Sequence, residues 1–404
     1  MTTLDPRPAP TTTARLLAGA HPGGAVGLAE HRDLHGAPAP LDRAALEALC
    51  RETGLRGRGG AGFPVATKLA ATPGGRRTHV VVNGSESEPA SHKDRTLMRH
   101  APHLVLDGVA VVARALGTDR TSLVVHDPAA AHAIRAALAE RSDLSLRVEL
   151  TPASFVAGEA RSVTSTLSGG AAVPGGRRVL PSESGVDGRP TFLSNAETFA
   201  AIGLHACRGR VPSDGAEDGT TLATLWGDVD RVGVLEIVHG TPLDDLTARP
   251  GRPVLVGGYH GTWVRSDGLT VDRDALRAAG ATWGAGVVAV LPEATCPLGE
   301  VARVAHWLAQ QSARQCGPCT FGLPAIAADL DALVQGDVTA AERLTRRTAT
   351  VRGRGACAHP DGATRFVDTA LAVLHDDLAL HRHGGCGRPV LGVLPVPHPE
   401  EGHR

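Results

Sequence analysis

Short apolar runs that alternate with helical patterns constrain the fold of this chain more than any other feature of its first half. Each run is brief and bounded by polar residues, as buried strands are, while the segments between them carry apolar residues at helical spacing. A chain that alternates strand and helix in this way predicts an α/β layered domain. The expected strands are 79–83, 122–126 and 146–150, and the expected helices between them are 104–116 and 128–141.

The segments outside this core differ in character. Residues 1–40 are rich in Ala, Pro, Gly and Thr and predict a loose arm. The polar, Gly-rich stretch 207–220 is a candidate boundary, and 222–264 has the short apolar runs of a small β-rich module that contains one small helix. Further helices are expected at 41–55, 298–315, 326–335, 340–351 and 368–380.

Composition excludes several classes of protein. The chain has 404 residues, of which 42% are hydrophobic, enough for two to four domains with a buried core. Its net charge of -1 and its few aromatic residues argue against a nucleic-acid binder. We expect no secretory signal and no membrane span, and seven scattered cysteines do not form a disulfide framework, so a reducing cytoplasm is expected.

Five glycines lie between Gly54 and Gly62, and three of them, Gly57, Gly59 and Gly62, satisfy G-x-G-x-x-G. The context is not that of a dinucleotide-binding fingerprint, because a helical pattern and not a strand precedes the loop. Such a loop can still bring backbone N–H groups close to a phosphate. A flexible surface turn is the alternative.

Lysine is almost absent from the chain. Lys68 and Lys93 are the only two lysines among 41 basic residues, so a retained lysine suggests a need for a compact ammonium that Arg does not supply. Lys68 follows the glycine loop and could add a charge to a bound phosphate. Chance is the alternative explanation.

Polar residues follow the expected strands. Asn83, Glu86 and Glu88 come directly after the first strand, where α/β folds place ligands and where carboxylates can bind ribose hydroxyls. A solvated acidic loop would look the same. Two further polar tips, Gly158-Glu159 and Asn195 to Thr198, are not diagnostic alone.

Cys316 and Cys319 form a C-x-x-C pair, and Cys357 lies downstream. This spacing favours an iron–sulfur cluster, but Cys316, Cys319, Cys357 and His359 could also bind zinc, or the site could hold no metal. A thioredoxin-type pair is disfavoured because the pair is expected to end a helix.

Taken together, these motifs resemble a known family. The segments GLRGRGGAGFP (54–64), VVNGSESEPASHKDR (81–95), AGEARSVTSTLSG (157–169), SGVDGRPTFLSNAET (184–198) and QCGPC (315–319) occur in this order. The set is similar to the NADH-binding flavoprotein (the F subunit) of respiratory NADH:quinone oxidoreductase and its hydrogenase and formate dehydrogenase relatives, as a divergent member.

The resemblance implies an architecture. After the flexible arm of 1–40 it places an FMN- and NAD-binding α/β domain at 41–215. A β-grasp module of the soluble-ligand-binding type follows at 221–285, then a helical iron–sulfur bundle at 290–385 and a C-terminal tail at 386–404.

The resemblance also implies site residues. Gly60 and Lys68 would face the FMN phosphate or ribityl chain, and Phe63 would stack near the nicotinamide cofactor. The implied cofactor-binding set is Gly57, Arg58, Gly59, Gly60, Gly62, Phe63, Lys68, Asn83, Glu86, Glu88, Gly158, Glu159, Asn195 and Thr198. The implied cluster ligands are Cys316, Cys319 and Cys357.

The chain departs from the family pattern at several of these positions. Ala71 and Leu180 replace two pocket aromatics, Ala160 replaces the second Glu of G-E-E, and Ser85 replaces an acidic residue. Ala313 replaces the first cluster cysteine, so a [3Fe–4S] cluster, or a [4Fe–4S] cluster with water, His359 or Cys386 as fourth ligand, is expected.

The expected function is therefore electron transfer by a flavoprotein, in the manner of an NADH dehydrogenase subunit. NAD(P)H would reduce FMN, and single electrons would pass through the cluster to a ferredoxin-like protein or another oxidoreductase subunit. The alternatives are an FMN and iron–sulfur relay that no longer binds NADH, and a scaffold without its cofactors. The expected place is the cytoplasm, or the periphery of a membrane redox complex.

Overall fold

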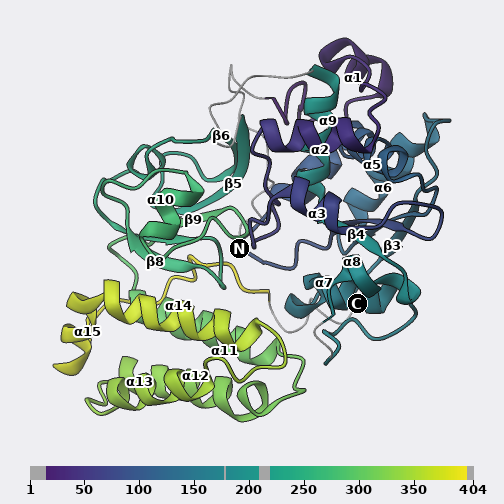
Figure 1. The fold of residues 1–404 in the computed structure, drawn as a ribbon. Coiled ribbons are helices and arrows are strands. Elements are labelled where there is room, and N and C mark those ends of the chain that lie inside the picture. The colour runs from purple at the N-terminus through teal and green to yellow at the C-terminus, as the bar shows by residue number, and fades with distance from the viewer. Residues whose placement is uncertain (1–14, 177–178, 209–218, 398–404) are drawn as a thin grey trace.

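The computed structural model describes residues 15–176, 179–208 and 219–397. Two units, each built on its own sheet, lie side by side, and a group of helices lies beneath the second sheet (Figure 1). The expectation of a mixed α/β fold with a helical part is confirmed.

The first sheet has four parallel strands in the order β3-β2-β1-β4. The three strands expected from the apolar runs are all present, and β4 completes the sheet beside β1. The bounds are β1 His79–Gly84, β2 Thr121–Val125, β3 Arg147–Leu150 and β4 Thr191–Asn195.

Helices cover both faces of this sheet. Val80 and Val82 of β1 pack with α5 (Pro102–Leu116) and α9 (Ala196–Arg208) in one core cluster. The residue between them, Val81, belongs to a cluster on the opposite face with α7 (Ala160–Leu167). Burial on both faces explains why these strands are continuous apolar runs.

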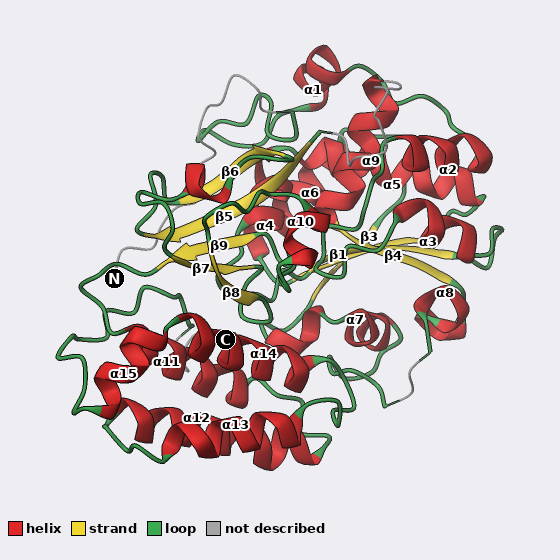
Figure 2. Cartoon of the chain, turned by 60° about the vertical axis from the view of Figure 1, so that its left-hand side comes forward, coloured by secondary structure: helices red, strands yellow, loops and turns green. Residues whose placement is uncertain are grey.

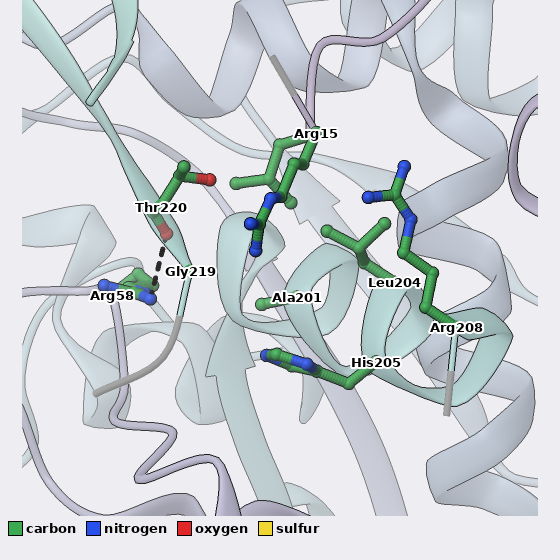
Figure 3. Close-up of a pocket in the computed structure, with 9 residues that line it drawn as sticks. Arg15, Arg58, Ala201, Leu204, His205, Arg208, Gly219 and Thr220 are labelled. Atoms are coloured by element: carbon green, nitrogen blue, oxygen red, sulfur yellow. Dashed lines mark hydrogen bonds between the residues drawn. The ribbon is translucent and has the colours of Figure 1, made fainter. Parts of the chain in front are cut away.

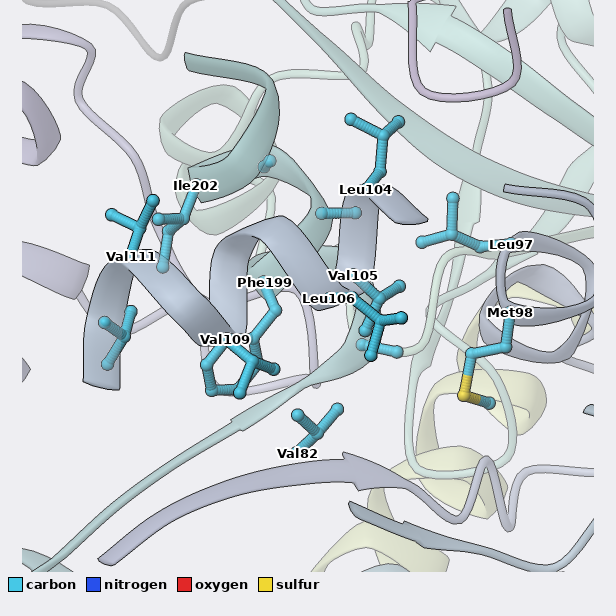
Figure 4. Packing of buried hydrophobic residues seen from close by; sticks show 14 of the residues in the cluster. Val82, Leu97, Met98, Leu104, Val105, Leu106, Val109, Val111, Phe199 and Ile202 are labelled. Carbon is cyan, nitrogen blue, oxygen red and sulfur yellow. The ribbon is translucent and has the colours of Figure 1, made fainter. Parts of the chain in front are cut away.

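Two glycines bring α5 and α9 into close contact over the sheet, where Leu104, Val105 and Phe199 pack (Figure 4). A Cβ on Gly108 would lie 1.9 Å from the carbonyl oxygen of Phe199, and one on Gly203 would lie 2.6 Å from that of Leu104. No side chain fits at either position, because real Cβ atoms do not approach backbone so closely.

The second sheet has five strands in the order β6-β5-β9-β7-β8, with only the β5–β9 pair parallel. The β-rich module expected after residue 221 is therefore present, but its last strand lies beyond the expected end at 285. The bounds are β5 Thr220–Gly227, β6 Gly233–Val238, β7 Pro253–Val256, β8 Thr262–Arg265, β9 Val287–Val290 and α10 Arg273–Ala278.

The C-terminal helices pack on one another beneath β8, as Figure 2 shows. The backbone N–H of Trp263 donates to the Thr369 hydroxyl and joins the second sheet to this group. The bounds are α11 Pro297–Gln310, the short π-helix η4 Pro318–Gly322, α12 Leu323–Val334, α13 Ala340–Val351, α14 His359–Val373 and α15 His375–Arg382.

Shorter elements complete the chain. Asp42 caps α2 by accepting a hydrogen bond from the N–H of Ala45, as its place at the start of the expected helix suggested. The bounds are α1 Leu28–His35, α2 Arg43–Glu52, α3 Val65–Ala71, α4 Lys93–His100, α6 Pro128–Ala139, η1 Phe155–Gly158, α8 Pro181–Ser184, η2 Val186–Gly188 and η3 Leu243–Leu246.

Both chain ends are more ordered than expected where the structure describes them. Residues 1–14 and 398–404 lie outside the described residues, but the expected loose arm contains α1, and the Glu236 carboxylate accepts hydrogen bonds from the N–H groups of residues 15–17. The Glu300 carboxylate likewise accepts hydrogen bonds from the N–H groups of residues 392–394 in the expected tail. Buried carboxylates that are distant in the sequence fix both segments. Local composition does not reveal such contacts.

Two expected helices have different bounds. The helix expected at 298–315 ends at Gln310, and the helix expected at 368–380 is two helices, α14 and α15, which meet at Leu374. Arg314 adopts a left-handed conformation with φ of 52°, which an α-helix does not continue through. Within the described residues, no helix has both the length and the apolar character that a membrane crossing requires.

Candidate functional site

The ends of β1 and β4 form the centre of the candidate site. Asn83 and Asn195 are register partners on these neighbouring parallel strands, so both amides lie at the carboxyl edge of the sheet. This edge is where α/β folds bind ligands. The structure therefore brings together two predicted residues that are far apart in the sequence.

The glycine loop lies over the end of β4. The backbone N–H of Arg58 donates to the hydroxyl of Thr198 at 2.9 Å, and a Cβ on Gly59 would lie 3.3 Å from the Asn195 Cβ. Gly60 has φ of 112°, a conformation that favours glycine, and open space surrounds the position of its missing Cβ. A ligand at this position could approach the loop backbone directly.

Lys68, on α3, points its ammonium at the same strand. Its Nζ donates to the carbonyl oxygen of Leu193 at 2.9 Å, two residues before the end of β4. Burial lowers the pKa of this ammonium, and no carboxylate of the described residues forms an ion pair with it. A largely buried cation with only a carbonyl partner fits an anionic ligand such as a phosphate.

Gly158 and Glu159 close the site on the other side of β1. The Asn83 amide donates to the carbonyl oxygen of Gly158 at 2.8 Å. A Cβ on Gly158 would lie 2.3 Å from the Ser87 hydroxyl oxygen, so a side chain there would require that hydroxyl to move. The Glu159 carboxylate caps α7 by accepting a hydrogen bond from the N–H of Arg161.

Glu88 links the site to the second sheet. Its carboxylate accepts hydrogen bonds from the backbone N–H groups of Tyr259 at 2.7 Å and Ala90 at 3.3 Å. Burial raises its pKa to about 8, so at neutral pH this carboxyl is mostly protonated. A protonated carboxyl can donate a hydrogen bond to a ligand as well as accept one.

Two predicted site residues, Arg58 and Glu86, direct their side chains elsewhere, and a third, Phe63, is exposed. The Arg58 guanidinium is buried against His239 and the carbonyl oxygen of Thr220, although its backbone belongs to the glycine loop. The Glu86 carboxylate accepts hydrogen bonds from the N–H groups of Asp94 and Arg95 at the start of α4. Phe63 is 47% exposed.

Lys93, the second of the rare lysines, belongs to a buried ion network. Its Nζ lies 2.9 Å from carboxylate oxygens of both Asp94 and Glu197. Burial alone would lower the pKa of Lys93, but these two carboxylates raise it. Asp94 also accepts a hydrogen bond from the Asn195 amide, so the network positions Asn195, which is a predicted site residue. The rarity of lysine had also pointed to Lys93, but this residue positions the neighbouring carboxylates.

The cysteines expected to bind a cluster meet at the start of η4. Cys316 and Cys319 interact through their thiols, and Cys357 is close enough to raise, with burial and Cys316, the pKa of Cys319 to about 12. The pair lies at the start of η4 and not at the end of a helix, contrary to the expectation, because α11 ends six residues before Cys316. The position of the pair relative to a helix therefore no longer disfavours a thioredoxin-type pair.

Neither expected fourth ligand joins this triad. The two ring nitrogens of His359 face His260 Nε2 at 3.0 Å and the carbonyl oxygen of Leu308 at 2.9 Å. Cys386 lies with Cys296 and His381 instead. These positions argue against a Cys3His zinc site at the triad, and they leave its fourth ligand position to a water or to no ligand.

The η1 turn, which ends at Gly158, lies near the helical group that carries the triad of Cys316, Cys319 and Cys357. Burial raises the pKa of the Cys357 thiol, and the charge of the Glu159 carboxylate adds to the effect. The η1 turn packs on the helical group through the Phe155 ring, whose centroid lies 5.2 Å from that of Trp307 on α11 and 5.5 Å from that of His359 on α14. One turn therefore borders both candidate cofactor sites.

A small cavity lies beside the glycine loop, where Arg15, Arg58 and Thr220 line it (Figure 3). Its volume of about 20 Å³ suits a water molecule and not a cofactor.

Comparison with known proteins agrees with this geometry. Residues 50–204 match the Nuo51 FMN-binding domain, and residues 299–381 match the NADH-ubiquinone oxidoreductase-F iron–sulfur binding region. The first match contains the glycine loop, Lys68 and both strand ends, and the second contains all three triad cysteines. The chain is a divergent member of the F-subunit family of NADH-quinone oxidoreductase.

Individual members of the family cover most of the chain. The F 2 subunit of the NADH-quinone oxidoreductase of Rhizobium meliloti (strain 1021) is 27% identical over 82% of this chain and 87% of its own length. The F subunit of the Mycobacterium bovis enzyme is 29% identical over 83% and 84%. Identity this low is consistent with the substitutions at pocket and cluster positions.

Solved structures give the same result. A chain of a NAD+-reducing [NiFe]-hydrogenase in the air-oxidized state superposes with a TM-score of 0.74 at 26% identity, over 85% of this chain. The H2-reduced state gives a TM-score of 0.76 at 25% identity, over 91% of this chain. The present chain spans 64% and 66% of the length of those hydrogenase chains.

The site fits both cofactors by the chemistry of its donors. For FMN, the buried ammonium of Lys68 and the open glycine backbone suit a phosphate, and the paired amides suit the polar edges of a flavin. For a cluster, Cys316, Cys319 and Cys357 supply three thiolates, the ligands that iron–sulfur clusters use.

Proposed function

We propose that this chain oxidises NAD(P)H with a bound FMN and passes single electrons, through an iron–sulfur cluster, to a partner protein. The observation that carries the proposal is the η1 turn, since the Gly158 carbonyl accepts a hydrogen bond from Asn83 at the strand ends while Phe155 packs on Trp307 and His359 of the helical group. FMN, when bound, supplies the conversion between a two-electron and a one-electron reaction.

The residues of the chain would bind and orient the reactants. Lys68 and the backbone of Gly57–Gly62 would hold the FMN phosphate, and Asn83 and Asn195 would position the ring system. Glu88, neutral at pH 7, would donate a hydrogen bond to the nucleotide. No side chain has to act as nucleophile or general base for hydride transfer.

The presence of three thiolates limits the type of cluster that can bind. Cys316, Cys319 and Cys357 would bind a [3Fe–4S] cluster, or a [4Fe–4S] cluster whose fourth iron carries a water, because Ala313 supplies no thiolate. We assign residues 41–215 to FMN and NAD binding, 221–290 to a β-grasp module that includes β9, and 291–385 to the cluster, in a cytoplasmic protein.

The face beside the triad would dock the partner. Phe321, two residues after Cys319, is 75% exposed, and a cavity of about 530 Å³ beside it is lined by Arg343, Arg346, Arg347 and Arg354. Exposed arginines around an exposed aromatic ring suit an acidic redox protein, such as a ferredoxin-like protein or another oxidoreductase subunit.

A second candidate function is a relay that no longer binds NADH. Leu180, which replaces a pocket aromatic, is 62% exposed, and Ala71, which replaces another, is exposed at the end of α3. The nucleotide would then lose two stacking contacts, worth about 1–3 kcal/mol each.

The ultraviolet–visible spectrum of anaerobically purified protein, before and after NADH addition, separates these functions. The proposal expects flavin and broad iron–sulfur absorption that bleaches with NADH. Absorption that bleaches only with dithionite would indicate the relay, and a colourless protein that takes up neither FMN nor iron would contradict both.

A further inference from the structure

Three metal-binding side chains meet at the opposite end of α11 from the triad. Cys296 precedes this helix and Cys316 follows it, and the 14 residues between Pro297 and Gln310 are a rise of about 21 Å. Cys296, His381 and Cys386 place Sγ, Nε2 and Sγ within 4.8 Å of one another. This cluster is separate from the candidate iron–sulfur site.

We propose that Cys296, His381 and Cys386 bind a divalent zinc-class metal ion, with a water in the fourth position. Two thiolates and one imidazole are ligands that such an ion prefers, and they are too few thiolates to suggest an iron–sulfur cluster. A tetrahedral zinc site puts neighbouring ligand atoms about 3.5–3.8 Å apart. The Cys296 Sγ to His381 Nε2 distance of 3.3 Å is close to this, so only small side-chain shifts are needed.

The hydrogen bond on the other side of the imidazole supports the site. His381 Nδ1 lies 2.9 Å from the carbonyl oxygen of Val334, at the end of α12. Because a carbonyl only accepts, Nδ1 carries the proton and Nε2 presents its lone pair to Cys296. Metal-binding histidines are oriented by such a bond, and the metal would replace the thiol proton that Nε2 now faces.

The environment of the two thiols also suits metal binding. The backbone N–H of Gly299 donates to Cys296 Sγ at 3.3 Å, which stabilises a thiolate. Gly384 and Gly385, with φ of 107° and 105°, turn the chain after α15 so that Cys386 returns to His381. Cys296 and His381 are 2% exposed while Cys386 is half-buried, so a water could reach the metal from the Cys386 side.

The ion would be structural. It would join α11, α15 and the segment after Cys386, and the hydrogen bonds that Glu300 and Tyr259 make to residues 392–395 continue the same attachment. The site would therefore fix the C-terminal segment to both the helices and the second sheet. It does not depend on FMN, NADH or the triad.

Elemental analysis of the anaerobically purified full chain tests the proposal. We expect about one zinc per chain in addition to iron. Cys386→Ser, at a half-buried position, should lose the zinc and keep iron and flavin, while Cys207→Ser, at a half-buried cysteine outside the cluster, should keep all three. Retention of zinc by Cys386→Ser, or absence of zinc from the parent, would overturn the proposal.

Three measurements on the parent protein avoid dependence on the folding of a variant. A thiol-blocking mercurial should release zinc to a chromogenic chelator, and Co2+ added to the zinc-free protein should give thiolate charge-transfer bands. Mass spectrometry after anaerobic alkylation should find Cys296 and Cys386 unlinked. A mass lower by two hydrogens, with both thiols unreactive, would identify a disulfide and would also overturn the metal site.

Discussion

The backbone N–H of Tyr259 donates to the Glu88 carboxylate at 2.7 Å, and this bond joins the ligand edge of the first sheet to the second sheet. Gly258 makes the approach possible, because a Cβ there would lie 2.5 Å from a Glu88 carboxylate oxygen. The two sheets therefore meet at a carboxyl whose pKa is unusually high.

Stability of the cofactor-free chain should fall as the pH rises through this pKa. Burial raises the Glu88 pKa from 4.5 to about 8, so between these values the folded chain binds more protons than the unfolded chain. Stability then decreases with pH and levels off above about pH 8, by about 5 kcal/mol in total, of which about 3 kcal/mol is lost above pH 6. Urea unfolding at pH 6 and pH 9 should show this loss in the parent, and a smaller one in Glu88→Gln. Equal slopes in both would show that Glu88 ionises normally.

Lys68→Met should weaken FMN binding by about 10- to 100-fold, the usual worth of a hydrogen bond to a charged group. Riboflavin, which lacks the phosphate, should bind the parent and the variant alike. Fluorescence titration of both flavins into flavin-free protein checks this. A parallel loss of riboflavin affinity would mean that Lys68 supports the fold of the pocket and does not contact the phosphate.

Ala313→Cys should complete the cluster. The neighbouring Ser312 lies close enough to Cys319 to lower the pKa of its thiol, so a thiol at position 313 would lie near the triad. In the oxidised parent we expect the paramagnetic signal of a [3Fe–4S] cluster, and in Ala313→Cys its replacement by an oxidised, diamagnetic [4Fe–4S] cluster. Ala313→Ser is the matched control. Electron paramagnetic resonance with iron analysis makes the comparison, and an unchanged signal would place residue 313 outside the cluster.

Arg346→Glu with Arg354→Glu should slow electron transfer to an acidic partner. Neither arginine forms an ion pair within the described residues, and both line the cavity beside Phe321. The parent rate should fall as salt screens the attraction, while the variant should be slow and nearly independent of salt. Stopped-flow reduction of a bacterial ferredoxin tests this, with Arg265→Glu on β8 as control. Equal effects of both changes would exclude this face.

Local pattern predicted three of the four strands of the first sheet, and β1 and β2 are continuous apolar runs because they are largely buried. It missed β4, which is also buried. The end of the first strand pointed to Asn83 and the rarity of lysine pointed to Lys68, and both remain predicted site residues. Local pattern gave the wrong end for the helix before Cys316, because the left-handed Arg314 that follows the helix is not a glycine. The helix α1 was missed because the contacts that hold it are distant in the sequence: His31 hydrogen-bonds to Asp107 and Arg32 forms an ion pair with the same carboxylate.

The second cysteine cluster shows a different limit. Cys296 and Cys386 are 90 residues apart and each looks like an isolated cysteine in the sequence. Only the return of the chain after α15 brings them to His381. Spacing reveals ligand sets when they lie within one turn or loop, as Cys316 and Cys319 do, and not when the fold assembles them.

The crossing of α5 and α9 at Gly108 and Gly203 has a consequence for motion. Backbone in direct contact with backbone leaves no side-chain layer that could slide or repack. Since α9 begins at the residue after Asn195, the amide of Asn195 is held as rigidly as the crossing itself. Rearrangements during turnover would then occur where the units join, at the η1 turn and the Glu88–Tyr259 contact, while the floor of the pocket remains fixed.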